Sequence, residues 1–235
     1  MSKPLASSIP PSLPPGIKAA LIDMDGVLFD SMPFHAASWH RLFTELGVTT
    51  SRPEEYYLYE GMKGSDTIGM ILKRELDIDT TEEERREIYA KKAELFKDCG
   101  QAPAMPGAAK MLAGLKKLGI DTYLVTGSAQ GSLLDNLDSL YPGFFPKEKR
   151  ITALDVKNGK PHPEPYLRGV EKAGVDPSQA IVIENAPLGV RAGKAAGLFT
   201  IAVTTGPIPA EAFVKEKADI IFPDMISFAD WLHKI

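Results

Sequence analysis

Two aspartates, Asp23 and Asp25, stand one residue apart at the end of a short apolar run. The run, residues 17–22, is bounded by prolines before it and a glycine after it, which is the pattern of a buried strand. Because side chains alternate along a strand, both carboxyl groups point the same way and Met24 turns toward the core. Such a pair can supply a nucleophile, a proton donor and a metal ligand, although a bare pair more often only caps a strand before a turn.

Three later segments favour the chemical interpretation. They are an apolar strand pattern that ends in TGS at residues 126–128, a GKPHPEPY segment at residues 159–166, and an apolar strand pattern that ends in Glu and Asn at residues 184–185. Each is a weak signal alone, since Ser or Thr often follows a strand and a lone lysine is usually a solvated charge. In this order, after the DMDGVLFDS start at residues 23–31, they resemble the four motifs of the haloacid dehalogenase superfamily.

The resemblance implies phosphoryl transfer through the two carboxylates. That reaction needs a nucleophile in line with the leaving group and a proton for the departing oxygen. Asp23 is the candidate nucleophile, which forms an aspartyl-phosphate intermediate. Asp25 is the candidate general acid and base, which protonates the leaving oxygen and later takes a proton from water. Dehalogenation is not expected, because that branch of the superfamily does not use the second acid found here.

Phosphoryl transfer also needs groups that neutralise the charge on the transferred group. By the same resemblance, Thr126 and the amides of Gly127 and Ser128 bind the phosphoryl oxygens. Lys160 adds a positive charge that matters most in the transition state. A non-catalytic binding protein that keeps the fold is an alternative, but the joint presence of these residues and the two aspartates argues against it.

Mg²⁺ is the expected cofactor, because two carboxylates this close repel unless a cation lies between them. The expected ligands are a side-chain oxygen of Asp23, the backbone carbonyl of Asp25, which the family resemblance supplies, and the fourth motif. Where the family usually has a second acid, this chain has Asn185, which we expect to bind directly, with Glu184 binding through water. The alternative is that Asn185 caps a helix that starts near Pro187.

The predicted fold class is α/β, a Rossmann-like core with a mostly parallel sheet plus an inserted α-helical cap. Apolar strand patterns separated by helix-like segments indicate the parallel sheet, and they cover residues 19–22, 121–125, 151–153, 180–183, 200–203 and 219–222. Helical patterns without a convincing strand cover about 33–46, 66–76 and 82–96. The family commonly carries such a helical cap just after its first motif.

These patterns predict three parts of the chain. Residues 1–16, with five prolines and four serines, are expected to be a flexible lead-in. Residues 17–30 and 106–235 form the predicted core domain. Residues 31–105 form the predicted cap, with the return crossing marked by prolines and a glycine near residue 106.

The cap supplies the remaining candidate substrate contacts. His35 and Trp39 are four residues apart and so share one face of the first cap helix. Core packing is the expected role of Trp39, whereas packing and active-site contact are equally open for His35. The polar loop at residues 59–65 can reach across a cleft. In it, Glu60 could replace the missing acid as a metal ligand and Lys63 could contact phosphate, although charged loop residues are usually only solvated.

Within the superfamily the chain most resembles the β-phosphoglucomutase-like group, which holds mutases, small-metabolite phosphatases and an inorganic pyrophosphatase. The mutase pattern places an arginine shortly after the Lys-Gly pair, but here the next arginine after Lys63 is Arg74. The acid at Glu60 and the Glu184-Asn185 pair look most like the pyrophosphatase. Hydrolysis of inorganic pyrophosphate is therefore the leading prediction, with a phosphosugar mutase or a small sugar-phosphate phosphatase as the alternative.

Composition excludes several other classes. The 235 residues are 44% hydrophobic and 25% charged, as in an ordinary globular protein, and the net charge of −4 gives no electrostatic footprint for nucleic acid. No stretch is apolar enough to span a bilayer or to serve as a signal peptide. The single cysteine, Cys99, fits a reducing compartment and is expected to be structural. We expect a cytoplasmic monomer whose partner is a small phosphorylated substrate.

Overall fold

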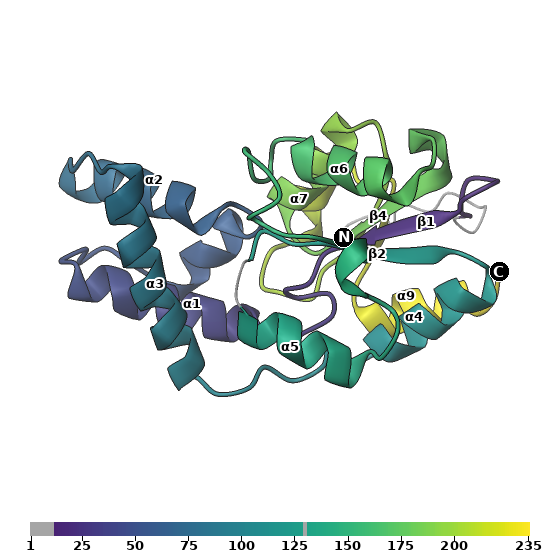
Figure 1. The fold of residues 1–235 in the computed structure, drawn as a ribbon, viewed down its shortest axis with the longest axis horizontal. Coiled ribbons are helices and arrows are strands. Elements are labelled where there is room, and N and C mark those ends of the chain that lie inside the picture. The colour runs from purple at the N-terminus through teal and green to yellow at the C-terminus, as the bar shows by residue number, and fades with distance from the viewer. Residues whose placement is uncertain (1–11, 129–130) are drawn as a thin grey trace, which may run out of the picture.

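A six-stranded parallel sheet forms the centre of the computed structural model, which describes residues 12–128 and 131–235 (Figure 1). The strand order is β3-β2-β1-β4-β5-β6. The strands are β1 (Ala19–Ile22), β2 (Asp121–Val125), β3 (Arg150–Ile151), β4 (Ala180–Glu184), β5 (Phe199–Val203) and β6 (Ile220–Phe222). Strand β1 pairs with both β2 and β4, and Ile22 lies opposite Leu124 and Ile183. The residues that follow these three strands therefore emerge side by side at one edge of the sheet.

The sheet confirms the predicted α/β class, and the observed bounds of β1 and β2 match the predicted ones while those of the other strands differ by one or two residues. The clearest difference is at β3, which was expected to continue to Ala153 but ends at Ile151. The backbone N–H and the hydroxyl of Thr152 both donate to Asp155 Oδ2, at 2.7 and 2.8 Å. This local bonding turns the chain away from the sheet, because Thr and Asp side chains compete with strand pairing for backbone groups.

Helices cover both faces of the sheet (Figure 1). Helices α4 (Ala108–Lys117), α5 (Gly131–Leu140) and α9 (Met225–Leu232) lie on one face, and α6 (Glu164–Ala173) and α7 (Pro187–Ala195) on the other. Helix α8 (Ala210–Lys215) packs beside α7 through Phe213 and Val190. Alternate residues of β1 feed the two cores: Ala20 and Ile22 pack in the cluster with α4 and α9, Ala19 and Leu21 in the cluster with α6 and α7. Short 3-10 turns at Lys147–Lys149 and Pro177–Gln179 precede β3 and β4.

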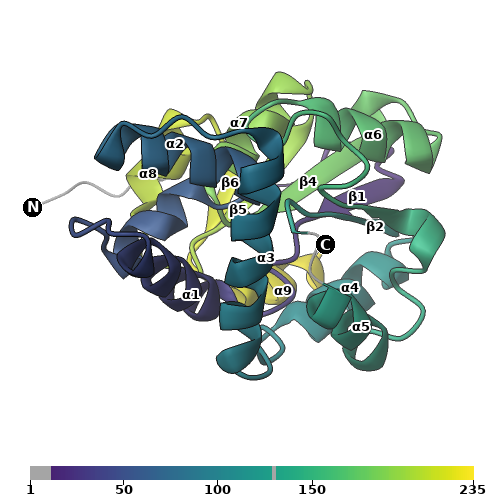
Figure 2. The same cartoon turned by 60° about the vertical axis from the view of Figure 1, so that its left-hand side comes forward.

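The segment between β1 and β2 in the chain is helical and carries a hydrophobic cluster of its own. Its residues 32–98, which we call the helical insertion, form α1 (Met32–Glu45), a 3-10 helix (Pro53–Tyr59), α2 (Gly64–Leu76) and α3 (Glu82–Asp98), and α4 follows them on the sheet. Figure 2 looks from its side, with α1, α2 and α3 in front of the sheet. Three helices were expected here, whereas the 3-10 helix was not.

Local signals explain where the helices of the insertion begin. Pro33 lies within the first two residues of α1, where the missing N–H of a proline costs nothing. Thr81 and Glu84 form a capping box at the start of α3. Helix α2 begins at Gly64, two residues before the expected start, so the polar loop that crosses toward the core is reduced to residues 60–63.

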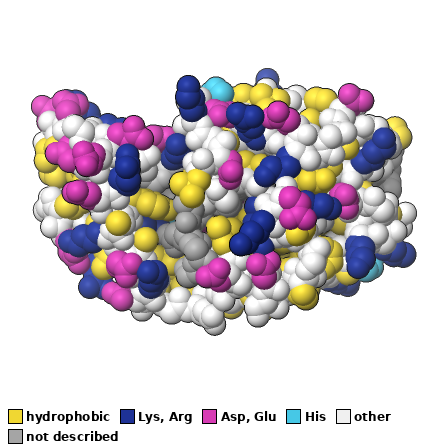
Figure 3. All heavy atoms as spheres, viewed as in Figure 1, with side chains coloured by type: hydrophobic (Ala, Val, Ile, Leu, Met, Phe, Trp, Pro, Cys, Tyr) yellow, Lys and Arg dark blue, Asp and Glu magenta, His cyan; other side chains and the backbone are white. Residues whose placement is uncertain are grey.

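Several sequence-based expectations concern the termini and the surface. Residues 1–11 of the expected lead-in lie outside the described residues, while Leu13 packs against the main core. Cys99 donates weakly to the carbonyl of Leu95 at 3.5 Å, as a structural thiol does. Charges of both signs are interspersed over the face in Figure 3. None of the helices in residues 12–128 and 131–235 is long and apolar enough to cross a membrane.

Gly193 marks a point where α7 touches the sheet, and its replacement should destabilise the fold. A Cβ there would lie 2.7 Å from Thr200 Oγ1 and 3.2 Å from a methyl group of Val182. We expect Gly193→Val to lower the free energy of unfolding by about 1–3 kcal/mol, the usual cost of overpacking a core. Urea denaturation measures this, with Ala195→Val as the control because Ala195 is exposed on the same helix. The control should cost about 0.5 kcal/mol, and equal losses in the two variants would contradict the packing argument.

Candidate active site

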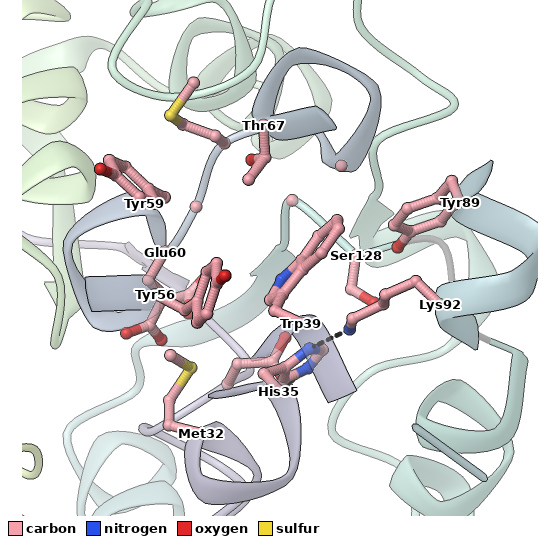
Figure 4. A pocket seen from close by; sticks show the side chains of 16 residues that line it. Met32, His35, Trp39, Tyr56, Tyr59, Glu60, Thr67, Tyr89, Lys92 and Ser128 are labelled. Atoms are coloured by element: carbon pink, nitrogen blue, oxygen red, sulfur yellow. Dashed lines mark hydrogen bonds and ion pairs between the residues drawn. The ribbon is translucent and has the colours of Figure 1, made fainter. Parts of the chain in front are cut away.

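A pocket lies between the edge of the sheet where β1 ends and the helical insertion (Figure 4). The core contributes Asp23, Asp25, Gly127 and Ser128 to its lining. The insertion contributes mainly aromatic and aliphatic side chains together with His35, Glu60 and Lys92, and these apolar residues are Met32, Trp39, Tyr56, Tyr59, Met62 and Tyr89. The pocket therefore has a charged floor and a largely aromatic wall.

Asp23 and Asp25 enter the pocket together, as strand alternation predicts. The two residues are 3% and 7% exposed, and Met24 between them is fully buried in the main core. The N–H of Asp23 donates to the carbonyl of Ile183 at 3.0 Å, which continues the pairing of β1 with β4 by one residue. At Gly26 the chain turns with φ of 75°, and a Cβ there would lie 1.9 Å from Asn185 Nδ2. A glycine is required for the first and fourth motifs to lie this close.

Lys160 does not itself line the pocket, but it is fully buried against Asp23. Its Nζ donates to Asp23 Oδ1 at 2.5 Å, to Glu184 Oε1 at 2.6 Å and to the carbonyl of Val125 at 3.0 Å. Burial opposes its charge, but the two carboxylates raise the pKa of Lys160 above its usual value. Burial also raises the pKa of Asp23 to about 8, with Lys160 acting in the opposite direction. The lysine thus compensates only part of the negative charge around the expected nucleophile.

The carboxylate of Glu184 accepts hydrogen bonds from several neighbouring groups. Besides Lys160, the hydroxyl of Tyr166 donates to its Oε1 at 2.7 Å, and the N–H groups of Asn185 and Ala186 donate to its Oε2 at 3.0 and 3.1 Å. Both carboxylate oxygens are occupied by these donors. The structure therefore gives Glu184 a role in holding Lys160 and the fourth motif in position, which sequence reasoning had not assigned.

Asn185 does not cap a helix. Helix α7 starts at Pro187 with Ala186 at the N-cap position and no side-chain cap, so that alternative is wrong. Instead, Asn185 Nδ2 donates to both carboxylate oxygens of Glu60, at 3.0 and 3.1 Å, across the gap between core and insertion. Burial, followed by the nearby Asp23, raises the pKa of Glu60 well above its usual range.

The donor set fits Mg²⁺. Asn185 Oδ1 is buried without a hydrogen-bond partner among the described atoms, which makes it a candidate to bind a water molecule or an ion. Glu60 is hydrogen-bonded to the Nδ2 end of the same amide, Asp23 and Glu60 both line the adjoining pocket, and hard oxygen donors of this kind suit Mg²⁺. No group of three His, Cys, Asp or Glu side chains set for a metal ion occurs in the described part of the chain, so the fit depends on the amide oxygen and on backbone oxygen as well.

His35 contacts the expected general acid, which answers the question left open between packing and active-site contact. Its Nε2 lies 3.0 Å from Asp25 Oδ1, and the hydroxyl of Ser31 donates to the same oxygen at 2.5 Å. On the other side of the ring, Nδ1 lies 2.6 Å from Lys92 Nζ (Figure 4). Burial, followed by Lys92, lowers the pKa of His35, so a neutral imidazole can donate to Asp25 and accept from the lysine.

Lys92 is a pocket residue that sequence reasoning missed. It is 1% exposed, its Nζ lies 5.0 Å from the ring centre of Trp39, and burial lowers its pKa to about 7. In the sequence it stands within EEERREIYAKKAELFKD, where nothing distinguishes it from the solvated lysines of an exposed helix. Trp39 is buried and stacked on Phe43, as expected from packing, but it also lines the pocket.

Two residues of the second motif lie at the pocket as expected, whereas Lys63 of the cap loop does not. Gly127 and Ser128 line the pocket, while Thr126 Oγ1 accepts from the Ser128 N–H at 3.0 Å and so shapes that loop. The structure does not bring Lys63 to the pocket. Its Nζ donates to two backbone carbonyls of the core at 3.2 Å each, so this geometry gives no support to a contact with phosphate.

The depressed pKa of Lys92 predicts a pH dependence of stability. Its folded-state value of about 7 lies below the ordinary 10.5, so between these values the unfolded chain binds a proton that the folded chain lacks. The free energy of unfolding of the wild type should therefore rise from pH 7 to pH 10, relative to Lys92→Met, which cannot titrate. Chemical denaturation across this range measures the difference. Lys91→Met, at an exposed neighbouring position, is the control for removal of a lysine from the same helix, and a constant difference for Lys92→Met would refute the assignment.

Comparisons with known proteins agree with this geometry. A family described as haloacid dehalogenase-like hydrolase matches residues 17–197. Hexitol phosphatase A of Escherichia coli (strain K12) is 31% identical over 207 residues, which cover 87% of this chain and 89% of that protein. Validoxylamine A 7'-phosphate phosphatase of Streptomyces hygroscopicus subsp. limoneus is 32% identical over 228 residues, which cover 92% and 97%.

A solved structure is also similar over nearly the whole chain. It is described as a putative beta-phosphoglucomutase from Bacteroides vulgatus, with 48% identity and a TM-score of 0.87, and it covers 93% of this chain and 89% of its own. The family match therefore covers more than half of the sequence. The same chain has the four motifs in order, the parallel sheet and the aspartate pair at the end of β1. The chain belongs to the haloacid dehalogenase-like hydrolase family.

Proposed function

We propose that this protein is a Mg²⁺-dependent phosphohydrolase that acts on a small sugar or polyol phosphate through an aspartyl-phosphate intermediate. The observation that carries the proposal is the placement of Asp23 and Asp25 side by side in one pocket, with Lys160 Nζ 2.5 Å from Asp23. The relatives described above are named as phosphatases of hexitol phosphates and of validoxylamine A 7'-phosphate, which supports the substrate class.

The first half of the reaction transfers the phosphoryl group to the enzyme. A carboxylate oxygen of Asp23 attacks phosphorus, and the bond between phosphorus and the substrate's ester oxygen breaks. Asp25 gives a proton to that oxygen, so the leaving group departs as an alcohol. Lys160 holds Asp23 in position and offsets part of the negative charge that spreads over the phosphoryl oxygens.

The second half returns Asp23 to its carboxylate form. A water molecule attacks phosphorus of the aspartyl-phosphate, Asp25 takes a proton from that water, and the bond between Asp23 and phosphorus breaks to release phosphate. The hydrogen bonds from Ser31 and His35 to Asp25 Oδ1 leave Oδ2 for proton transfer. They also fix the orientation of the carboxyl group in this structure.

The metal site is built from core and insertion together. Asp23, the backbone carbonyl of Asp25, Asn185 and Glu60 would hold Mg²⁺, which supplies positive charge that offsets repulsion between Asp23 and the incoming phosphate. The described acids Asp23, Asp25, Glu60 and Glu184 are all buried here, which favours binding of a divalent cation.

The pocket favours a hydrolase over a mutase. A mutase must bind a second phosphate, but among the described pocket residues Lys92 is the one lysine or arginine, and its Nζ is engaged by His35. Arg74, the first arginine after the Lys-Gly pair, donates instead to the hydroxyl of Tyr59 at 2.6 Å and does not line the pocket. The aromatic wall suits the C–H faces of a neutral leaving group.

Pyrophosphate is the second candidate substrate, because Glu60 reaches Asn185. A carboxylate at this place adds a negatively charged metal ligand, and a small, highly charged substrate gains most from stronger metal binding. The names of the relatives described above point instead to phosphates carried on larger organic groups such as hexitols. We therefore place pyrophosphate after them.

Removal of the nucleophile tests the mechanism. Phosphate release should be measured for pyrophosphate, hexitol phosphates, glycerol 1-phosphate, hexose phosphates and nucleotides, with Mg²⁺ and with EDTA. We expect Asp23→Asn to lose at least ~10³-fold in kcat on any substrate found, and EDTA to abolish turnover. Asp135→Asn, an exposed acid on α5, is the control and should retain wild-type rates. Full activity of Asp23→Asn would exclude the aspartyl-phosphate route.

Substitution of Glu60 tests whether this residue binds Mg²⁺, and the same titration compares the two classes of substrate. If its carboxylate binds Mg²⁺, Glu60→Gln should raise the Mg²⁺ concentration needed for half-maximal activity about tenfold, as loss of one ligand charge does. The Mg²⁺ titration should be repeated with pyrophosphate and with the best sugar or polyol phosphate, using Glu54→Gln, an exposed acid of the preceding 3-10 helix, as the control. Unchanged Mg²⁺ dependence in Glu60→Gln would show that Glu60 is not a metal ligand. A preference of the wild type for pyrophosphate would make pyrophosphate the first candidate substrate, ahead of the sugar and polyol phosphates.

A further inference from the structure

Lys63 makes an unusual pair of contacts between the helical insertion and the core. It occupies the N-cap position of α2, at the end of the 60–63 loop. Its Nζ donates to the carbonyls of Val156 and Lys157, both at 3.2 Å, which belong to the loop between β3 and α6. Since Lys63 does not line the pocket, it acts on the site through the segment that carries it.

The core loop presents these carbonyls because Glu164 binds the opposite side of the same peptide groups. The N–H groups of Lys157 and Asn158 each donate to the Glu164 carboxylate at 2.9 Å. In a trans peptide the N–H and the preceding carbonyl point in opposite directions. The two peptide groups therefore direct N–H toward the carboxylate and C=O toward Lys63.

Charge complements the peptide dipoles at both ends of this arrangement. A negative carboxylate lies at the N–H side and a positive ammonium at the carbonyl side, the orientation in which both charges stabilise aligned dipoles. The backbone bonds from Lys157 and then Asn158 lower the pKa of Glu164 to about 2, so the carboxylate is ionised at neutral pH. The core half of the contact, Glu164 with its two peptide groups, involves no residue of the insertion.

The 60–63 loop, which Lys63 ends, touches three of the four motifs. Glu60 accepts from Asn185, as described above. A Cβ at Gly61 would lie 2.9 Å from Lys160 Cδ, and a Cβ at Gly127 would lie 2.6 Å from the carbonyl of Gly61. Movement of this loop by a small distance would therefore change the surroundings of the metal site, of Lys160 and of the phosphate-binding turn together.

We propose that Lys63 is a positioning residue that latches the helical insertion closed over the active site, by binding two core carbonyls that Glu164 orients from the other side. The latch consists of Lys63, the peptide groups 156–157 and 157–158, and Glu164. It makes no contact with substrate. Its effect is on the fraction of molecules in which the 60–63 loop lies against the core, and so on apparent substrate affinity rather than on the chemical step.

Lys63→Met tests the latch, because it keeps the length of the side chain and removes the ammonium group. Hydrogen exchange of the intact protein without substrate should show exchange of the 60–64 amides about tenfold faster, which corresponds to loss of charge-assisted bonds between insertion and core. With a substrate that the wild type hydrolyses, KM should rise about tenfold while kcat stays within about twofold. Lys63→Arg should restore most of both properties.

Two further variants make the result specific. Lys157→Met keeps the accepting carbonyl and alters only an exposed lysine side chain of the same loop, so it should match the wild type. Glu164→Gln alters the core side of the latch and should raise KM in the same way. If Lys63 and Glu164 act together, the double variant Lys63→Met/Glu164→Gln should raise KM by less than the product of the two single fold-changes.

An unchanged hydrogen-exchange rate of the 60–64 amides in Lys63→Met would overturn the proposal. A fall in kcat at constant KM would also overturn it, because it would mean that Lys63 acts in the chemical step. If no substrate is found, the exchange measurement still decides the matter, so failure of the latch and failure of the proposed function are separable.

Discussion

Four carboxylate side chains are buried around the ends of β1 and β4, and the rest of the structure must compensate their negative charge. Asp23, Asp25, Glu60 and Glu184 are each less than 10% exposed. An ionised carboxylate removed from water costs several kcal/mol unless it gains a partner of opposite charge and a full set of hydrogen bonds. Each of these acids therefore needs compensation from neighbouring donors, some of them close in the sequence and others distant.

The chain provides that compensation unevenly. Glu184 receives four donors and Asp25 receives two, so both are held in fixed orientations. Asp23 shares Lys160 with Glu184, and Glu60 accepts from the amide of Asn185. The remaining deficit of positive charge lies at Asp23, Glu60 and the unpartnered oxygen of Asn185, which is where a metal ion and a phosphoryl group would be bound. Perturbed acids gathered in one pocket are typical of a functional site.

The insertion contributes to this balance as well as to the shape of the pocket. Lys92 and His35 come from α3 and α1 and act on Asp25 of the core, while Glu60 crosses to Asn185. The acids of the core and the pocket residues of the insertion are thus linked by direct hydrogen bonds. The conformation of the insertion and the electrostatics of the two aspartates are consequently coupled.

The amino-acid sequence by itself determined the elements and the motif positions. The alternation around Met24 predicted that Asp23 and Asp25 point into one crevice, and β1 and β2 have the predicted bounds, because burial patterns and turn residues act locally. Only the tertiary structure decided which side chains of the insertion meet the core. Lys92 and Lys63 look alike in the sequence as lysines of polar segments, yet one is buried against His35 and the other is bound to backbone carbonyls. That difference depends on long-range packing of α1, α3 and the 60–63 loop against the sheet edge, which no local pattern encodes.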